Sequence, residues 1–199
     1  MRSSCRPRVE CALVWSGNDV TVITPSLPER TVLLGRAIGS VRGQTRQPYE
    51  HLIALDYALH GDGHVARNRL VAAATTEWVA FLDDDDAWRP RHLEVMLQVE
   101  AEQESDIVCS LIEWTGDGPT ANHSCDFTTV RASNWFNPSA ALVRRSLLLD
   151  VGGFPAPAPP MWDDWAAWIA MLNAGARYAC THDPSASVIY YWHGGNISA

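Results

Sequence analysis

The chain contains no lysine, and all fifteen of its basic residues are arginine. Acidic residues outnumber basic ones and the formal net charge is −8, which argues against a broad basic surface for nucleic acid. The missing lysine indicates a GC-rich coding genome and favours a bacterial or bacteriophage origin. An acidic chain can still bind an anionic nucleotide when a divalent cation lies between them.

Paired cysteines are also missing. The number of cysteines is odd and no CxxC pair occurs, which disfavours both a disulfide framework and a zinc site. A reducing compartment is therefore favoured, and the predicted localisation is cytoplasmic. The cysteines concerned are Cys5, Cys11, Cys109, Cys125 and Cys180.

Long apolar runs are absent as well. The arginine-containing N-terminus leads into an apolar stretch that Glu10 interrupts, which is too short for a secretory signal. No segment approaches the ~18 apolar residues of a membrane span, so no integral membrane segment is expected. Residues 1–18 are predicted to be a loose extension, and residues 19–199 have the length of a single domain with a substantial core.

The first hundred residues alternate β-branched or apolar runs with segments of helical spacing. This alternation predicts an α/β fold, with a mostly parallel sheet covered by helices on both faces. A short helix is also expected before the Gly152-Gly153 pair. Expected strands lie at 20–24, 51–55, 78–82, 106–114, 140–144 and 187–192, and the longer helices at 30–42, 65–74, 91–102 and 162–173.

Three polar segments follow the ends of three expected strands. They are residues 24–26, Asp56 and residues 83–86. Because ligands of open α/β sheets bind beyond the carboxyl ends of the strands, these segments are expected to meet at one edge.

The aspartate run 83–86 is the strongest chemical signal in the sequence. Four adjacent carboxylates repel one another, and Mg²⁺ or Mn²⁺, which prefer oxygen ligands, would relieve that repulsion. A solvated acidic loop is the alternative for an arbitrary run. Here the run directly ends the apolar strand expected at 78–82, which favours a metal or nucleotide role.

Several segments together resemble family 2 glycosyltransferases. Residues 81–88, FLDDDDAW, resemble that family's strand-ending DxD motif, and residues 20–26, VTVITPS, resemble its opening strand and nucleotide loop. The resemblance covers about residues 20–198, with the motifs in the family's order. The other matching segments are Ala66-Arg67-Asn68, Val151-Gly152-Gly153-Phe154, Trp162-Asp163-Asp164-Trp165, and Tyr191-Trp192-His193 with Asn196 and Ser198.

This resemblance implies a GT-A fold, Rossmann-like, with a nucleotide-binding half at 19–105 and an acceptor-binding half at 106–199. It also implies a metal-dependent, inverting transfer from a nucleotide sugar, by default a UDP-sugar. Asp85 would be the main metal ligand, Asp83 would share the metal or contact the ribose, and His193 would reach the metal or the diphosphate. The nucleotide-binding residues implied are Thr24, Pro25, Ser26, Arg30, Asp56, Arg67, Asn68, Asp83 and Asp84, with Asp56 accepting a hydrogen bond from the base.

Asp164 is the candidate catalytic base. An inverting transfer needs a carboxylate that takes the proton of the acceptor hydroxyl as it attacks the anomeric carbon. The alternative for Asp163 and Asp164 is an acidic first turn favoured by the helix dipole. The family usually has glutamate where Asp163 stands. Asp86 would face the sugar or cap the next helix.

Other residues have weaker claims. Residues 60–64, HGDGH, contain metal-ligating residue types, although the glycines also suit a turn and Asp62 a helix cap. Trp162, Trp165 and Trp168 share one helical spacing, so at least one is expected in the core and one could stack on an acceptor sugar. Residues 122–124 and 196–198 have the sequence pattern of N-glycosylation sites, but a bacterial cytoplasmic chain would not use them.

Two further functions compete with the transferase. A non-catalytic nucleotide- or glycan-binding module would need Asp83 and Asp85 but not Asp164. A sugar nucleotidyltransferase would need a glycine-rich loop after the first strand and a lysine, and the sequence has neither. The acceptor stays open: a saccharide, a lipid-linked precursor, a natural product or a modified base.

Overall fold

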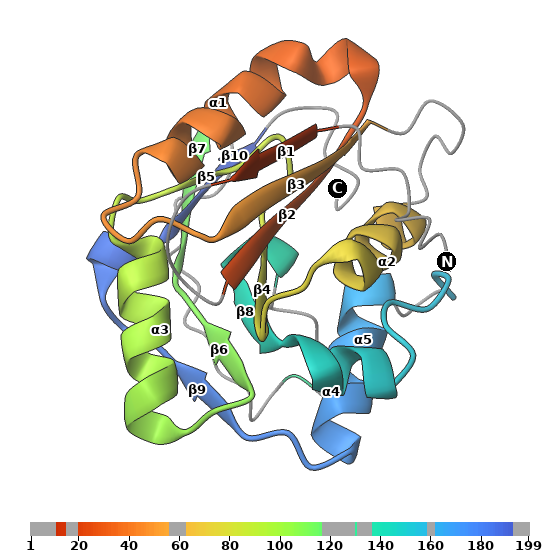
Figure 1. Ribbon diagram of the computed structural model, residues 1–199. Coiled ribbons are helices and arrows are strands. Elements are labelled where there is room, and N and C mark those ends of the chain that lie inside the picture. The colour runs from red at the N-terminus through yellow and green to blue at the C-terminus, as the bar shows by residue number, and fades with distance from the viewer. Residues whose placement is uncertain are drawn as a thin grey trace, which may run out of the picture.

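A computed structural model describes residues 11–14, 20–55, 63–116, 130, 137–158 and 162–192. Three parallel strands form its centre, β3 (Glu50–Leu55), β2 (Val20–Ser26) and β4 (Trp78–Phe81), in that spatial order (Figure 1). These strands are almost entirely buried. Such burial explains why β4 appears in the sequence as an apolar run, whereas β2 and β3 also bury polar side chains such as Thr24 and His51.

Four more strands widen this centre into a seven-stranded sheet with the order β1-β3-β2-β4-β8-β6-β9. β8 (Ala141–Arg144) runs antiparallel between β4 and β6 (Ile107–Cys109), and β9 (Tyr178–Cys180) pairs parallel with β6. At the opposite edge, β1 (Cys11–Val14) pairs antiparallel with β3. Residues 11–14, which the sequence suggested were a loose extension, therefore form an edge strand.

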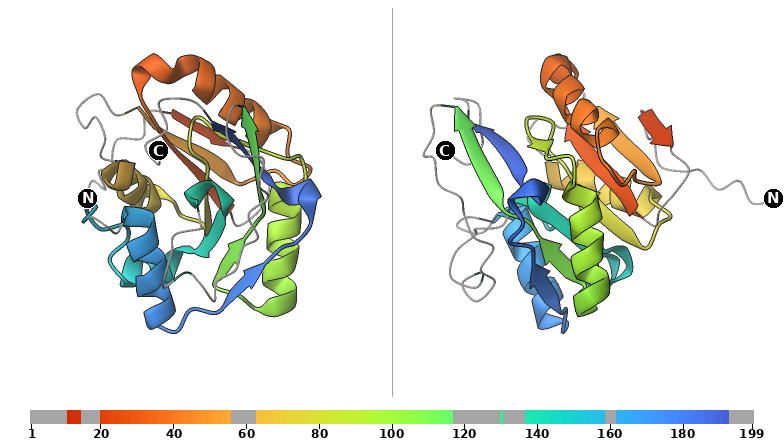
Figure 2. Two further views of the ribbon diagram at one scale, coloured as in Figure 1. Left: turned by 180° about the vertical axis from the view of Figure 1, so that it is seen from behind. Right: turned by 90° about the vertical axis from the view of Figure 1, so that its left-hand side faces the viewer.

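Helices cover both faces of this sheet, as predicted. α1 (Thr31–Arg42) and α3 (His92–Gln103) lie on one side, and α2 (Gly63–Ala73), α4 (Arg145–Asp150) and α5 (Asp163–Asn173) lie on the other (Figures 1 and 2). The α/β class predicted from the alternation is confirmed. Within the described residues, three single-turn 3-10 helices, each with proline in its first turn, join these elements: η1 (Pro28–Arg30), η3 (Pro138–Ala140) and η4 (Pro184–Ala186).

The strand expected at 106–114 is wrong as a single element. It divides into β6 and β7 (Ile112–Gly116), and β7 joins β10 (Val188–Trp192) and β5 (Ala87–Trp88) in a second, three-stranded sheet. The chain changes partners at one peptide. The N–H of Ser110 still donates to Ala140 beside β8, whereas the carbonyl of Leu111 already accepts from Val188 of β10.

An aromatic cluster holds the centre of the sheet against α5. The rings of Phe81, Phe154 and Trp168 come from the end of β4, from the turn after α4 and from α5. Their centroids lie 5.1 to 6.3 Å apart, and all three side chains are buried. This packing sets the position of α5 relative to the end of β4, which is where the aspartate run begins.

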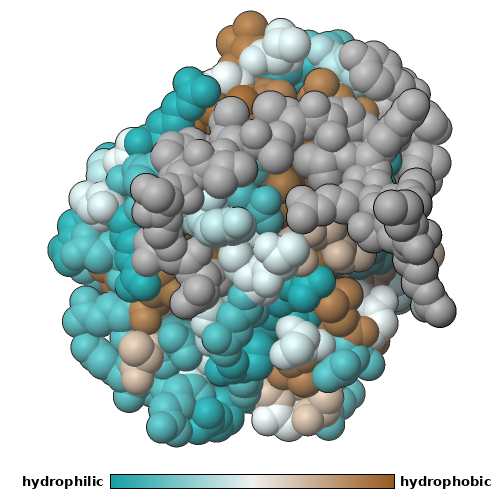
Figure 3. Space-filling view, in the orientation of Figure 1, coloured by the Kyte–Doolittle hydropathy of each residue, from teal (hydrophilic) through white to brown (hydrophobic). Residues whose placement is uncertain are grey.

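The described surface in Figure 3 is mostly hydrophilic, with hydrophobic residues in small groups. Isolated apolar residues of this kind are ordinary on a protein surface. None of the described helices has the length and apolar character needed to cross a membrane.

Candidate active site

The aspartate run forms a tight turn between β4 and β5. The N–H of Asp86 donates to the carbonyl of Asp83 at 3.1 Å, which closes the turn. The N–H of Asp83 donates to the hydroxyl of Ser139 at 3.0 Å, so η3 holds the start of the turn from outside. Leu82 still donates to Ile23 of β2, which places the turn directly beyond the end of the parallel sheet.

Arginine side chains neutralise most of this turn. The guanidinium of Arg30 contacts Asp84 at 2.9 Å and Asp85 at 2.6 Å. Arg67 donates to Asp83 at 2.7 Å, and Arg36 donates to the backbone carbonyl of Asp85. Nothing within the run offsets its charge, and the arginines that do so come from η1, α1 and α2. The sequence contained the compensating groups, but their distance along the chain concealed the pairing.

Asp84 is buried within the turn, and the Ser26 hydroxyl donates to it at 2.6 Å. Burial raises the pKa of Asp84 to about 6, although the Ser26 hydrogen bond and the charge of Arg30 oppose the shift. The bond ties the end of β2 to the turn. Ser26 and Asp84, both predicted nucleotide-binding residues, therefore meet directly.

Asp86 is fully buried, close to the charges of Asp85 and Asp83 and to the Ser139 hydroxyl. Burial raises the pKa of Asp86 well above its ordinary value, and the charges of Asp85 and Asp83 add to the effect. The predicted helix cap does not form, because α3 begins only at His92.

Asp163 and Asp164 occupy the first turn of α5, where the helix dipole favours negative charge. Asp163 accepts from Arg67 at 3.1 Å, so one arginine joins the aspartate turn to α5. Asp164 is only 8% exposed, and its carboxylate accepts from the N–H of Trp165 at 2.7 Å. The candidate base and the candidate metal ligands are thus linked through a shared arginine neighbour.

Asn68 follows Arg67 on α2 but forms hydrogen bonds with a different segment, the turn that contains Phe154. Its side-chain amide donates to the carbonyl of Phe154 at 2.7 Å and accepts from the N–H of Phe154 at 2.8 Å. Gly153 has φ +74°, and a Cβ there would lie 2.3 Å from the Asn68 oxygen, so only glycine fits. In this structure Asn68 binds the Gly-Gly-Phe turn, while its predicted nucleotide role stays a prediction.

Thr24 and Pro25 lie within β2, which extends to Ser26 rather than ending at the proline. The buried Thr24 hydroxyl pairs with the imidazole of His51 at 2.8 Å. Pro25 pairs with β3 in a stretch of β2 beyond the last residue paired with β4. The nitrogen of Pro25 faces the side of β2 where β4 no longer pairs with it, so the missing N–H costs no hydrogen bond of the sheet.

Two predicted site residues, Asp56 and His193, lie outside the described residues, as do Asn196, Ser198, most of 60–64 and the sequon at 122–124. Near the end of the described chain, Tyr191 lies 3.5 Å beneath the guanidinium of Arg36. Arg36 in turn bonds to Asp85, so β10 reaches the aspartate turn.

The three tryptophans of α5 have different environments. Trp168 is fully buried in the aromatic cluster, and the indole N–H of Trp165 donates to the carbonyl of Val130. Trp162 is 46% exposed at the start of the helix, next to Asp163. One tryptophan is therefore core, as expected, and Trp162 is the one with a surface for a ligand.

The described residues contain no cluster of three or more His, Cys, Asp or Glu side chains arranged to hold a metal. Mg²⁺ and Mn²⁺ do not require one, since they are usually held by one or two carboxylates together with phosphate oxygens and water. Asp83 contacts Arg67 through Oδ1, and Asp85 contacts Arg30 through Oδ2. Both are carboxylates, and carboxylate oxygens are the ligands that Mg²⁺ and Mn²⁺ prefer.

Comparison with known proteins indicates a glycosyltransferase. The family model for glycosyl transferase family 2 matches residues 60–156. A Bacillus subtilis protein described as the uncharacterized glycosyltransferase YwdF is 30% identical over 192 residues, covering 81% of this chain and 70% of that protein.

Solved structures agree on the fold. Residues 1–349 of Staphylococcus aureus TarS in complex with UDP superpose with a TM-score of 0.70 at 16% identity, over 87% of this chain and 60% of that one. The mannosyltransferase PcManGT from Pyrobaculum calidifontis, in complex with GDP-Man and Mn²⁺, gives 0.62 at 18% identity, over 86% and 56%. The chain therefore spans less than two thirds of these structural relatives.

The GT-A fold expected from the sequence motifs is confirmed by these neighbours. The sequence matches favour a glycosyltransferase over the two competing functions, a non-catalytic binding module and a sugar nucleotidyltransferase. The chain belongs to glycosyltransferase family 2.

Proposed function

We propose that the chain moves a sugar from a nucleoside diphosphate sugar, by preference a UDP-sugar, to an acceptor hydroxyl with inversion at the anomeric carbon. The supporting observation is the Arg67 contact with both Asp83 and Asp163, which brings the aspartate turn and the start of α5 together. The structural relatives support the donor class, since TarS forms a complex with UDP and PcManGT a complex with GDP-Man.

In the proposed reaction the acceptor oxygen attacks the anomeric carbon from the face opposite the diphosphate. Asp164 takes the hydroxyl proton as the new carbon–oxygen bond forms. The bond from the anomeric carbon to the phosphate oxygen breaks, and its electron pair leaves with the nucleoside diphosphate. Asp164 is largely buried but keeps a small exposed fraction, 8%.

Asp83 and Asp85, with His193, would hold a divalent metal. Bound there, Mn²⁺ or Mg²⁺ would supply charge stabilisation for the departing diphosphate. Arg30 and Arg67 would contact the phosphates from the positions they already hold beside the aspartate turn. The nucleotide would lie along residues 24–26, with Asp56 accepting from the base.

The test is a panel of UDP-glucose, UDP-N-acetylglucosamine and GDP-mannose with Mn²⁺, scored for hydrolysis and for transfer. Asp85→Ala is expected to lose nucleotide binding, whereas Asp164→Asn is expected to bind normally and lose turnover. Asp150→Asn, an exposed acid at the end of α4, is the matched control. Normal turnover by Asp164→Asn would refute the base assignment, and failure of every donor to bind with metal would refute the proposed function.

A further inference from the structure

The Arg67 side chain is the centre of a bridge between distant parts of the chain. It is 11% exposed and donates to Asp83, 16 residues away, and to Asp163, 96 residues away. Burial lowers the pKa of Arg67, but the charges of Asp83 and Asp163 outweigh that effect and hold the pKa above its ordinary value. The bridge is therefore permanently charged.

Packing confines this guanidinium. It lies 5.7 Å from the centre of the Phe154 ring, and a Cβ on Gly63 would approach its Nη1 to 3.2 Å. The next residue, Asn68, clamps the backbone of Phe154 with two hydrogen bonds. Arg67 thus projects from a part of α2 that is itself fixed to the turn before α5.

The forked guanidinium suits this double contact. Its Nη1 donates to Asp163 and its Nη2 donates to Asp83, so each carboxylate has its own nitrogen. Lysine has a single ammonium group and would not reproduce that geometry.

Asp163 and Asp164 are consecutive residues of one helical turn, so an anchor on Asp163 also sets the direction of Asp164. Asp163 stands where the family has glutamate, and its carboxylate is committed to Arg67. A contact with substrate is therefore not needed to explain an acid at this position.

We infer that Arg67 is a positioning residue that acts through Asp163 to aim Asp164 at the acceptor hydroxyl that attacks the donor held by the aspartate turn. This inference rests on the proposed function and deepens it. It separates the two acids of α5, since Asp163 orients and Asp164 reacts. On this inference, the orientation of Asp164 relative to the donor site depends on the ion-paired bridge of Asp83, Arg67 and Asp163.

The decisive variant is Asp163→Asn, because it breaks the bridge without touching Asp83. Turnover of whichever donor of the panel the wild type hydrolyses should fall about tenfold or more, since small misplacements of reacting groups cost that much. The KM for the donor and the Kd for UDP with Mn²⁺ should stay within about twofold of the wild-type values, because uniform donor binding is not changed.

Arg67→Met should lower turnover at least as far, and the double variant Arg67→Met with Asp163→Asn should be no slower than Arg67→Met alone. Arg67→Lys should restore only part of the activity. Arg89→Met and Glu113→Gln break a two-pronged ion pair that joins the residue after β5 to β7, and they should leave turnover unchanged.

Amide hydrogen exchange gives a readout independent of activity. In Asp163→Asn the first turn of α5 should exchange faster than in the wild type, while α3 should exchange as before. Wild-type turnover in Asp163→Asn, a loss confined to donor KM, additive effects in the double variant, or unchanged exchange in α5 would each overturn the inference. Inactivity of the wild type towards every donor would instead count against the proposed function.

Discussion

At the scale of single residues, the site is a set of carboxylates balanced by arginines. Arg30 spans Asp84 and Asp85, and Arg67 spans Asp83 and Asp163. A metal at Asp83 and Asp85 would have to share carboxylates with these guanidinium groups. Metal affinity without nucleotide is therefore expected to be weak.

Removing Arg30 tests that competition. Arg30→Gln should tighten Mn²⁺ binding in the absence of nucleotide by roughly fivefold, the equivalent of about 1 kcal/mol for one partly exposed ion pair. Titration calorimetry with Mn²⁺ alone measures this directly. Arg91→Gln removes an exposed arginine paired with Glu94 and serves as the control. Weaker or unchanged Mn²⁺ binding by Arg30→Gln would show that the guanidinium does not compete.

A second residue-scale effect concerns pH. His51 is fully buried against Thr24, and burial, helped by the charge of Arg42, lowers its pKa from 6.5 to about 3. The unfolded chain binds a proton at His51 below pH 6.5, whereas the folded chain does not until about pH 3. The contribution of neutral His51 is therefore complete above pH 6.5 and is lost as the pH falls through this window.

Denaturant unfolding at pH 7 and pH 4.5 checks the effect. His51→Gln should lose less stability than the wild type between these two pH values, by about 2 to 3 kcal/mol at 1.4 kcal/mol per pKa unit. The exposed His182, replaced by glutamine, should follow the wild type. Equal losses for His51→Gln and wild type would show that His51 is not held neutral.

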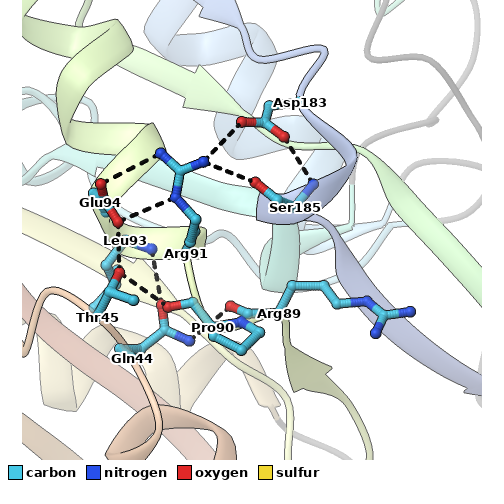
Figure 4. Close-up of polar contacts among 9 residues, drawn as sticks. All are labelled: Gln44, Thr45, Arg89, Pro90, Arg91, Leu93, Glu94, Asp183 and Ser185. Atoms are coloured by element: carbon cyan, nitrogen blue, oxygen red, sulfur yellow. Dashed lines mark hydrogen bonds and ion pairs between the residues drawn. The ribbon is translucent and has the colours of Figure 1, made fainter.

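At the scale of elements, α3 shows how a helix can start without a cap of its own. Its N-cap position, Arg91, makes no side-chain cap bond. Instead Gln44, just beyond α1, accepts from the N–H of Leu93 and donates to the carbonyl of Arg89 (Figure 4). In the same view Arg91 contacts Glu94 and Asp183, which ties the helix start to η4.

Gln44→Met should lower the free energy of unfolding by at least about 2 kcal/mol, because buried backbone groups lose their partners. The matched control is Gln98→Met, since Gln98 is exposed on α3 and bonds only to Glu102 among the contacts described. Thermal or urea unfolding measures both. A loss no larger than the control's would mean that water replaces Gln44 at the helix start.

The long elements could be predicted from the sequence, but the short ones could not. The helices and the three central strands were predicted to within about two residues, because each has a strong apolar pattern or a clear end. β5, with two residues, and β9, with three, are too short for a pattern. The break between β6 and β7 has no glycine or proline at Ser110-Leu111 and arises from a change of strand partners.

The site was predictable to a similar depth. The order of the motifs singled out the aspartate turn and the start of α5 as candidate site segments. The rule that ligands bind beyond the carboxyl ends of parallel strands predicted Ser26 and Asp84 at one edge of the sheet, and there the two side chains are hydrogen-bonded. Pairings such as Arg67 with Asp163, 96 residues apart, depend on tertiary packing. No local spacing encodes them, so the partners of the arginines could only come from the structure.

At the scale of the whole molecule, the aromatic cluster of Phe81, Phe154 and Trp168 joins the sheet, the Gly-Gly-Phe turn and α5. These are the parts that carry or hold the site residues. Donor turn and candidate base are thus packed on one core. Stability and site geometry are therefore expected to fail together.

Trp168→Ala should lower the free energy of unfolding by about 3 to 5 kcal/mol, as for other large buried aromatics. Trp162→Ala, which removes a half-exposed ring from the same helix, should change it by less than about 1 kcal/mol. Urea unfolding followed by circular dichroism compares the two. Similar losses for both variants would show that the cluster is not the main link between α5 and the sheet.

The arginine pairs of the aspartate turn have a last consequence, for acid–base titration of the reaction. Guanidinium groups keep their proton at every pH at which the protein is folded. The counter-charges beside residues 83–85 therefore never titrate, unlike the lysines that other phosphate sites use. Between about pH 5 and 9 the arginines therefore add no ionisation of their own to a pH–rate profile, which leaves the carboxyl groups of the site and the proposed ligand His193 as the protein groups to consider.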